Sequence, residues 1–398
     1  MGDPHLVTVP SASAHAFDHL GFAIDLLVAG ALRALRPCDD VTISATRDDT
    51  NIPSVRAAAD TETRDFAAAT TALAGDPVVI GSTRTPEAAA WTQQVWARLQ
   101  ALGVLETGAF VAPWCDVCDA YVDAAARVSV CPACGGEVRD RVERNWFLRT
   151  EPFADYLARW RETVTTMGPA AAAARTSPPP PALISVSRSV SRTRGVGVPV
   201  PDDPDQVIHS GLVVAACYLM PTAAGGWATA ASRTQVLGKG VVNLHTTVVP
   251  LLCAALGTPA ADRLHVHHHI RVDGADPRTA ARDAASLSGL LQTYGAPRIR
   301  WWLARLGLTR RDADLALRDL PHLRGRELDT SSRGGHRTDP ERFAPLLERD
   351  LDAADLGRIA RGILVARSDP TVLDALPPAS RRRFDAIESW ICGTGAAA

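Results

Sequence analysis

Four cysteines in two Cys-x-x-Cys pairs constrain this chain more than any other feature of its sequence. Cys115 and Cys118 form the first pair, and Cys131 and Cys134 form the second after twelve intervening residues. Each pair places two thiolates on one tight turn, and two such turns complete the tetrahedral sulfur set that a structural zinc ion prefers. The spacing therefore predicts a zinc site with four cysteine ligands and no open coordination position for catalysis. The alternative is a set of four free or redox-active cysteines.

Apolar strand patterns alternate with amphipathic helix patterns upstream of these cysteines. We expect strands at 6–9 and 41–45 and helices at 19–35, 65–73 and 86–102. Strands separated by helices of this length are typical of a parallel sheet with crossover helices. The sequence therefore predicts an α/β protein.

The pattern changes after the second cysteine pair. We expect a helix over 143–163, an alanine- and proline-rich linker over 167–181, and strands at 182–187 and 196–200. From about Leu287 onward the pattern is helical, with a polar loop over 324–340. The C-terminal part is therefore predicted to be all helical.

Charge and hydropathy narrow the class of protein. The formal net charge is −2, so there is no global attraction to nucleic acid or to an anionic membrane. A basic leader with a long apolar run is absent, and no apolar stretch reaches the roughly 20 residues of a membrane span. We expect a soluble cytoplasmic protein without a DNA or membrane partner. Lys239 is the only lysine, so any step that needs an ammonium group has one candidate.

A candidate nucleotide site follows the first predicted strand. His19-Leu20-Gly21-Phe22 opens the first helix, and the N-terminus of such a helix is where an open α/β sheet binds phosphate. Gly21 lets a nucleotide lie against the backbone, His19 can donate to a phosphate oxygen, and His15 is a second donor. The alternative is that His19 caps the helix or belongs to the core.

Taken in order, these features resemble the methionyl-tRNA synthetases, a family of class I aminoacyl-tRNA synthetases, over about residues 5–305. The segments that carry the resemblance are 19–21, the cysteine pairs, 143–149, 189–192, 197–201, 203–208, 238–239, His245, Pro250 and 272–274. The resemblance implies a Rossmann-like core split by a zinc-binding connective insertion. It divides the chain into 1–105 and 182–286 for the two halves of the core, 106–181 for the insertion with its linker, and 287–398 for a helical C-terminal region. It also implies ATP and Mg²⁺ beside the zinc ion.

The resemblance assigns roles to further residues. Arg192 contacts the amino acid or the phosphates, against the alternative of a surface arginine. His245 lines the amino-acid pocket together with Pro10, against the alternative of a core histidine. Asp48 or Asp49 holds the substrate ammonium. Asp273-Gly274 leads into the loop that contacts the ATP phosphates.

Several signature positions depart from the family. Phe22 replaces the second histidine of the His-Ile-Gly-His signature, Gly240 replaces an aspartate, and an aromatic–aspartate pair expected near Gly211 and Val213 is missing. The Lys-Met-Ser-Lys-Ser loop reads Asp276-Pro277-Arg278-Thr279-Ala280.

Losing one preorganised donor to developing charge costs about 3–4 kcal/mol of transition-state stabilisation. We expect Arg278 and Arg282 to supply the missing positive charge, because arginine binds phosphate bidentately. The predicted catalytic set is therefore His19, Arg192 and Arg278.

Two clusters have competing interpretations. His267 and His269 share one face of a predicted strand, where they either border the ATP site at the strand end or bind a metal. The arginines of the C-terminal part form either a solvated face or an RNA contact. Residues 350–358 resemble the first helix of the family's anticodon-binding bundle, and the segment that follows is too short for the whole bundle.

The sequence thus predicts a ligase that activates an amino acid with ATP and transfers it to a small-molecule or other non-tRNA acceptor in specialised biosynthesis. One alternative is a genuine methionine–tRNA ligase with tRNA as its partner. The other is a catalytically inactive paralog that binds a nucleotide or tRNA.

Overall fold

The fold is described from a computed structural model. It describes residues 4–393 except 11, 14–19, 50–59, 76–77, 118–119, 123–128, 132–133, 194, 222–225, 275–285, 307–311 and 320–338. His15, His19, Cys118, Arg278 and Arg282 fall outside the described residues.

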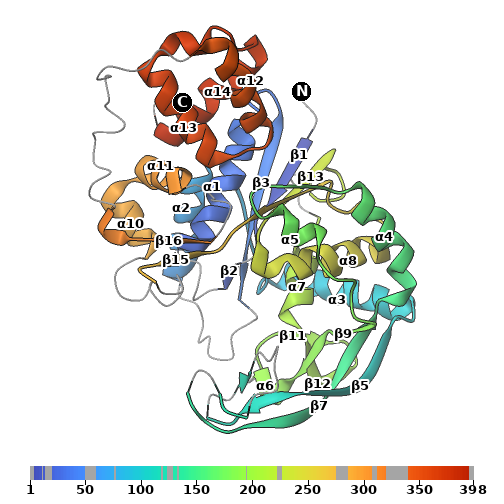
Figure 1. Cartoon of the computed structure of the whole chain (residues 1–398). Helices are drawn as coiled ribbons and strands as arrows, with labels where there is room; N and C mark the ends of the chain where they lie inside the picture. Colours follow the sequence, from blue (N-terminus) through green and yellow to red (C-terminus); the bar gives the residue numbers. More distant parts are fainter. Residues whose placement is uncertain are drawn as a thin grey trace.

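A seven-stranded parallel sheet forms the centre of the molecule (Figure 1). Its strands run in the order β4 (Val78–Ser82), β3 (Asp40–Asp48), β1 (Pro4–Thr8), β13 (Ser232–Gly238), β14 (Arg263–His267) and β8 (Thr165–Met167). The short β2 (Ala12–Ser13) continues the line of β1 beside the end of β3. The predicted α/β class and parallel sheet are confirmed.

Helices cover both faces of this sheet, and each face contributes apolar residues to its own core. Val7 and Val9 face α1 (Leu20–Ala34) and α2 (Asp60–Ala74), while Leu6 belongs to a second core with α3 (Pro86–Ala101), α4 (Ala154–Thr163), α7 (Ser210–Tyr218) and α8 (Val249–Leu256). A parallel sheet with crossover helices is typically buried in this way on both faces.

A long antiparallel ribbon projects from the core where the cysteines were found. Its strands are β5 (Leu105–Cys115) and β7 (Val138–Arg149), flanked by β6 (Ala120–Tyr121) and β9 (Leu183–Ser185). A smaller sheet of β10 (Ser187–Ser189), β12 (Asp203–Ile208) and β11 (Val198–Val200) lies next to it, with α6 (Val190–Thr193). Figure 1 shows both sheets at the end of the molecule opposite the C-terminal helices.

Two predictions for this region are wrong. Residues 143–149 belong to strand β7 instead of a helix, since eleven residues of β7 pair in register with β5 and supply its hydrogen bonds. The helix begins only at Ala154. The expected linker over 167–181 contains the end of β8 and α5 (Ala171–Arg175), because Thr165–Met167 pairs with β14 and forms the edge strand of the sheet. The turn at 168–170 and the proline-rich end lie outside helices and strands.

The C-terminal region is helical, as predicted, apart from the short β16 (Ala313–Leu315), which pairs with β15 (Ile270–Val272). It comprises α10 (Leu287–Tyr294), α11 (Ala296–Leu306), α12 (Pro340–Asp352), α13 (Leu356–Ser368) and α14 (Pro378–Cys392). These helices share one apolar core with α1 and α2. Within the described part of the chain, no helix has the length and apolar character needed to cross a membrane.

Candidate functional site

The strand order identifies the place where an open α/β sheet binds ligands. The chain leaves β1 through α1 to β3 on one side, whereas β13 and β14 lie on the other side of β1. Ligands bind outside the carboxyl ends of the strands at such a reversal. Pro10 follows the end of β1 there, Gly21 lies in the first turn of α1, and Asp48 ends β3.

A buried carboxylate–imidazole pair underlies this edge. His267 Nε2, at the end of β14, lies 2.7 Å from Asp25 Oδ1 in α1, and both side chains are almost completely buried. Burial lowers the pKa of His267, but the charge and hydrogen bond of Asp25 outweigh it, so that its pKa is raised. Burial has the opposite effect on a carboxylic acid, so that the pKa of Asp25 is raised too. The pair therefore retains its proton to a higher pH than a free imidazole does.

A second polar cluster closes the end of β13. His269 Nε2 accepts a hydrogen bond from the backbone N–H of Gly240 at 3.0 Å, and a Cβ at position 240 would lie 2.7 Å from that nitrogen. The His269 ring therefore occupies the space of a side chain at position 240. Lys239 forms an ion pair with Asp312 at 2.8 Å, and Asp312 also accepts from the backbone of His269 at 3.1 Å.

The two adjacent aspartates after β3 have different environments. Asp49 is fully buried and accepts hydrogen bonds from Arg47 Nε at 2.9 Å and Ser82 Oγ at 2.5 Å. The negative charge of Asp48 instead acts on Cys217 in α7, where burial and this charge raise the thiol pKa to about 12. Asp49 is thus held by structural hydrogen bonds. Asp48 is also buried, and its Oδ1 accepts a longer hydrogen bond from Thr83 Oγ1 at 3.4 Å.

His245 is enclosed on the same side of the sheet. It lies in the π-helix Leu244–Val248, is 1% exposed, and its ring is 5.6 Å from that of Tyr218 in α7. Neither ring nitrogen has a hydrogen-bond partner within the described residues. Burial lowers the pKa of His245 to about 3, so that the imidazole is neutral.

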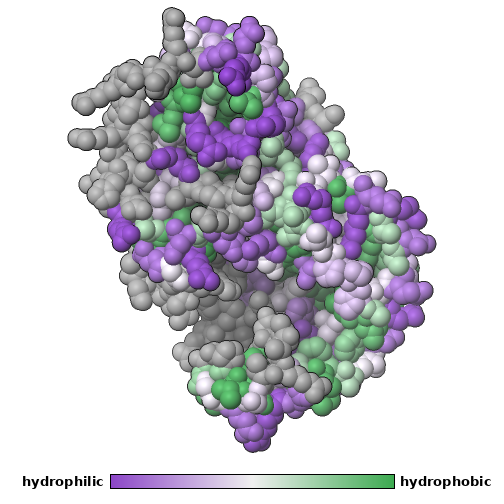
Figure 2. All heavy atoms as spheres, in the orientation of Figure 1, coloured by the Kyte–Doolittle hydropathy of each residue, from purple (hydrophilic) through white to green (hydrophobic). Residues whose placement is uncertain are grey.

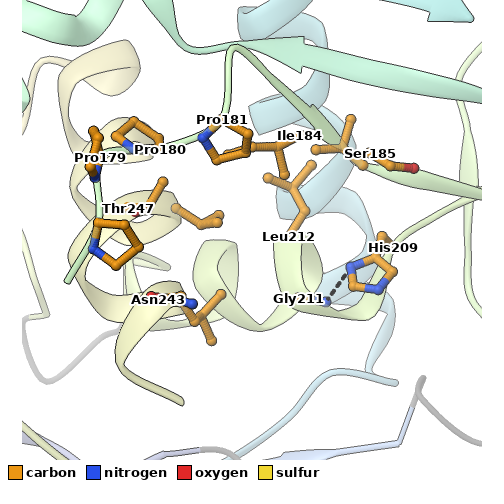
Figure 3. A pocket seen from close by; sticks show the side chains of 14 residues that line it. Pro179, Pro180, Pro181, Ile184, Ser185, His209, Gly211, Leu212, Asn243 and Thr247 are labelled. Carbon is orange, nitrogen blue, oxygen red and sulfur yellow. Dashed lines mark hydrogen bonds between the residues drawn. The ribbon is translucent and has the colours of Figure 1, made fainter. Parts of the chain in front are cut away.

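A pocket of about 320 Å³ is lined in part by Leu244, which precedes His245 in the sequence (Figure 3). Figure 3 shows the proline segment 178–181 on one side, the start of α7 on another and the π-helix on a third. His209 precedes α7, and its Nδ1 accepts from the N–H of Gly211 at 3.1 Å. Burial, followed by the charges of Arg188 and Arg192, lowers the pKa of His209 to about 3. Arg192 Nη1 lies 3.4 Å from a carboxylate oxygen of Glu143.

Other predicted site residues are placed differently. Asp273 and Gly274 form a turn in which Asp314 accepts from the N–H of Gly274 at 2.9 Å and Asp273 accepts from that of Leu317 at 3.3 Å. These hydrogen bonds fix the backbone of the turn, and the contact of Asp273 and Gly274 with the ATP phosphates stays a prediction. Strand β14 ends at His267, and within the described residues the histidines there do not gather with further ligands into a metal-binding group.

Sequence reasoning missed Asp25, His209 and the pocket. Asp25 interrupts the apolar pattern of α1, and a single acid on a buried helix face signals a buried partner. No such signal exists for the pocket, because its walls come from four separate stretches of chain. The space-filling view shows the hollowed face of the molecule between the ribbon and the core (Figure 2).

Three of the four cysteines meet at the tip of the ribbon. The sulfur atoms of Cys115, Cys131 and Cys134 all lie within 4.8 Å of one another, with Cys115 and Cys134 3.4 Å apart. Two sulfurs on a tetrahedral zinc are about 3.8 Å apart, given Zn–S bonds of roughly 2.3 Å. The N–H of Gly136 also points to Cys134 Sγ at 3.4 Å. The three cysteines therefore fit a structural zinc ion.

Comparison with known proteins gives a consistent set of relatives. Residues 115–331 match the family model described as tRNA synthetases class I (M). The mitochondrial methionine–tRNA ligase of Xenopus laevis is 26% identical over 353 residues, which are 82% of this chain and 62% of that protein. The methionine–tRNA ligase of Caldanaerobacter subterraneus subsp. tengcongensis is 24% identical over 224 residues, 54% of this chain and 35% of that protein. The chain thus spans less than two thirds of these relatives.

Solved structures show the same fold. The methionyl-tRNA synthetase of Mycobacterium tuberculosis in complex with methionyl-adenylate matches with a TM-score of 0.70 and 16% identity, over 98% of this chain and 89% of that chain. The apo form of that enzyme matches with a TM-score of 0.65.

Proposed function

Because the chain belongs to the family of class I tRNA synthetases (M), we propose that it activates an amino acid with ATP and transfers the aminoacyl group to a tRNA. In the first step a carboxylate oxygen of the amino acid attacks the α-phosphorus of ATP, and pyrophosphate leaves. In the second step a ribose hydroxyl attacks the acyl carbon, and AMP leaves. The observation that carries the proposal is the family match over the ribbon and the second half of the sheet.

The residues that the sequence singled out are assigned roles within this proposal. His19, His15 and Gly21 bind the phosphates at the start of α1, and Arg278 and Arg282 neutralise the charge of the leaving pyrophosphate. Mg²⁺, when bound, neutralises phosphate oxygens. Asp48 binds the substrate ammonium, since Asp49 is engaged by Arg47. Pro10 and His245 line the amino-acid site, and Arg192 approaches it from α6. The zinc ion holds the ribbon tip.

We propose tRNA as the acceptor of the aminoacyl group, in place of the small-molecule acceptor that the sequence predicted. The relatives named above are methionine–tRNA ligases, and none of their names supports another acceptor. One observation favours a non-tRNA acceptor as the second candidate. Five arginines of the C-terminal helices are paired with acids, which weakens the basic surface available to RNA: Arg349, Arg358, Arg367, Arg381 and Arg383.

The test has two stages with the zinc-loaded full chain. ATP–pyrophosphate exchange is measured with each amino acid, and total tRNA is then charged with those that support exchange. Exchange followed by tRNA charging is the expected result. Exchange without charging of any tRNA supports the non-tRNA acceptor. No exchange with any amino acid overturns the proposal and supports the inactive paralog, and ATP calorimetry then shows whether the nucleotide still binds.

A further inference from the structure

The size of the proline-lined pocket indicates a ligand larger than a few water molecules. Its volume is about 320 Å³. An apolar cavity of roughly 150 Å³ accepts benzene, and small-molecule pockets begin at about 300 Å³. The pocket therefore has room for a large side chain or a small ligand, with walls that include Pro179, Pro181, Ile184, Leu212 and Leu244.

The chemistry of the described walls favours an uncharged occupant, and the charges of Arg188 and Arg192 act on His209 from outside the lining. No charged side chain is among the described residues that line the pocket, and the imidazole of His209 is neutral because burial lowers its pKa to about 3. Burying an unpaired charge among such groups carries a large desolvation penalty. Polar atoms come from Ser185, Asn243 and Thr247, so that an occupant is apolar with at most a few hydrogen-bonding groups.

The position of the pocket links it to the sheet edge. Its wall residue Asn243 follows Lys239, at the end of β13, by four positions, and Leu244 directly precedes His245. From the other side, α7 provides Leu212 to the pocket and Cys217 to the neighbourhood of Asp48. Both helical walls therefore reach the region where the proposed amino-acid ammonium is held.

The proline wall is fixed at both ends. Ser177 Oγ donates to Asn243 Oδ1 at 3.2 Å, and Arg161 donates to the carbonyl of Pro178 at 3.1 Å. At the other end Thr150 Oγ1 donates to the carbonyl of Pro181 at 2.8 Å. A wall that is already ordered costs little entropy when a ligand binds. The pocket is therefore preformed.

We infer that the proline-lined pocket receives the side chain of the amino acid that is activated, and that this side chain is uncharged, apolar and larger than that of methionine, with an aromatic ring as its typical chemistry. The inference rests on the proposed function and names its substrate class. Leu212 and the proline segment form the walls that the side chain contacts.

The experiment compares ATP–pyrophosphate exchange for alanine, methionine, phenylalanine and tryptophan. The wild-type chain is expected to give the highest kcat/KM with phenylalanine or tryptophan. Asn243→Trp, at the exposed pocket rim, and Ile184→Trp, on the opposite wall, are each expected to lower the phenylalanine-to-alanine ratio by about tenfold or more, since pocket size discriminates by roughly 10–200-fold.

Two controls isolate pocket filling. Ser177→Ala removes the same hydrogen bond as Asn243→Trp without adding volume, and Leu346→Trp adds an indole on the exposed face of α12. Neither is expected to change the ratio more than about twofold. A preference for alanine or methionine, or an unchanged ratio in both filling variants, overturns the inference and leaves the proposed function intact. No exchange with any amino acid overturns the proposed function and this inference together.

Discussion

Trp390, in the last helix, packs directly on the Cα of Gly30, in the first. A Cβ at Gly30 would collide with the indole ring and would lie 2.7 Å from the carbonyl oxygen of Ala74. Arg300 covers the same indole, with its guanidinium carbon 4.9 Å from the ring centroid. The C-terminal helices therefore pack against α1 and α2 through a glycine that leaves room for a tryptophan.

Gly30→Ala is expected to lower the free energy of unfolding by about 1–3 kcal/mol, the usual cost of overpacking. The cost arises although alanine favours a helix over glycine by about 0.5–1 kcal/mol. Urea denaturation measures it. In a Trp390→Ala background the same change is expected to cost less, because the ring is gone and only the contact with the Ala74 backbone remains. Equal costs in both backgrounds would contradict the packing argument.

Gln235→Leu is expected to leave stability unchanged or to raise it by up to about 1 kcal/mol. Gln235 is 1% exposed, and neither Oε1 nor Nε2 has a hydrogen-bond partner within the described residues. A buried polar group without a partner costs about 1–3 kcal/mol. The matched control is Gln206→Leu. Gln206 accepts from Ser187 Oγ at 2.6 Å and donates to the Arg144 carbonyl at 2.8 Å, so its loss is expected to destabilise.

Cys131→Ser is expected to abolish stoichiometric zinc binding and to lower the unfolding temperature of the ribbon. Cys131 is one of three sulfurs that already lie together, and a structural zinc ion contributes directly to folding. Metal content by mass spectrometry is the readout. Cys38→Ser, at an exposed cysteine outside the cluster, serves as the control and is expected to retain one zinc per chain. Zinc retained in Cys131→Ser would refute the assignment.

Asp48→Asn and Asp49→Asn are expected to change different properties, KM in the first variant and stability in the second. Asp49 is buried and paired with Arg47, so that its neutralisation leaves a buried guanidinium without its counter-charge and costs about 3–5 kcal/mol of stability. Asp48→Asn is expected to keep its melting temperature within a few degrees and to raise KM for the amino acid in the exchange reaction. A KM effect confined to Asp49→Asn would reverse the assignment of the ammonium site.

Stability is expected to fall as the pH drops from about 6.5 toward 4. Burial lowers the pKa of His265 to about 3 from a model-compound value of 6.5. Between these values the unfolded chain binds the proton and the folded chain does not, so acid favours unfolding. His265→Leu is expected to reduce the loss of stability between pH 7 and pH 5, measured by urea denaturation at both values. An unchanged difference would mean that His265 titrates normally in the fold.

Local patterns were enough to predict the α/β class, the cysteine cluster and the helical C-terminal part. The period of apolar residues and the spacing of ligands are properties of neighbouring residues, so a linear reading can recognise them. The same reading failed at 143–149, where a segment with a helical pattern is a strand. Its partner β5 lies across the cysteine loop, and the pairing of the whole strand outweighed local propensity.

The sequence was therefore enough to predict the family of the chain and the sheet edge where ligands bind. It was not enough to predict how the residues of the site are arranged. Asp25 and His267 are separated by 242 positions, and the pocket joins a proline segment to two helices that follow it much later. Whether Asp48 or Asp49 forms the structural hydrogen bonds depends on the positions of the donor groups of Arg47 and Ser82. Such choices are made by packing between distant segments, because burial and hydrogen-bond partners exist only once the chain has closed on itself.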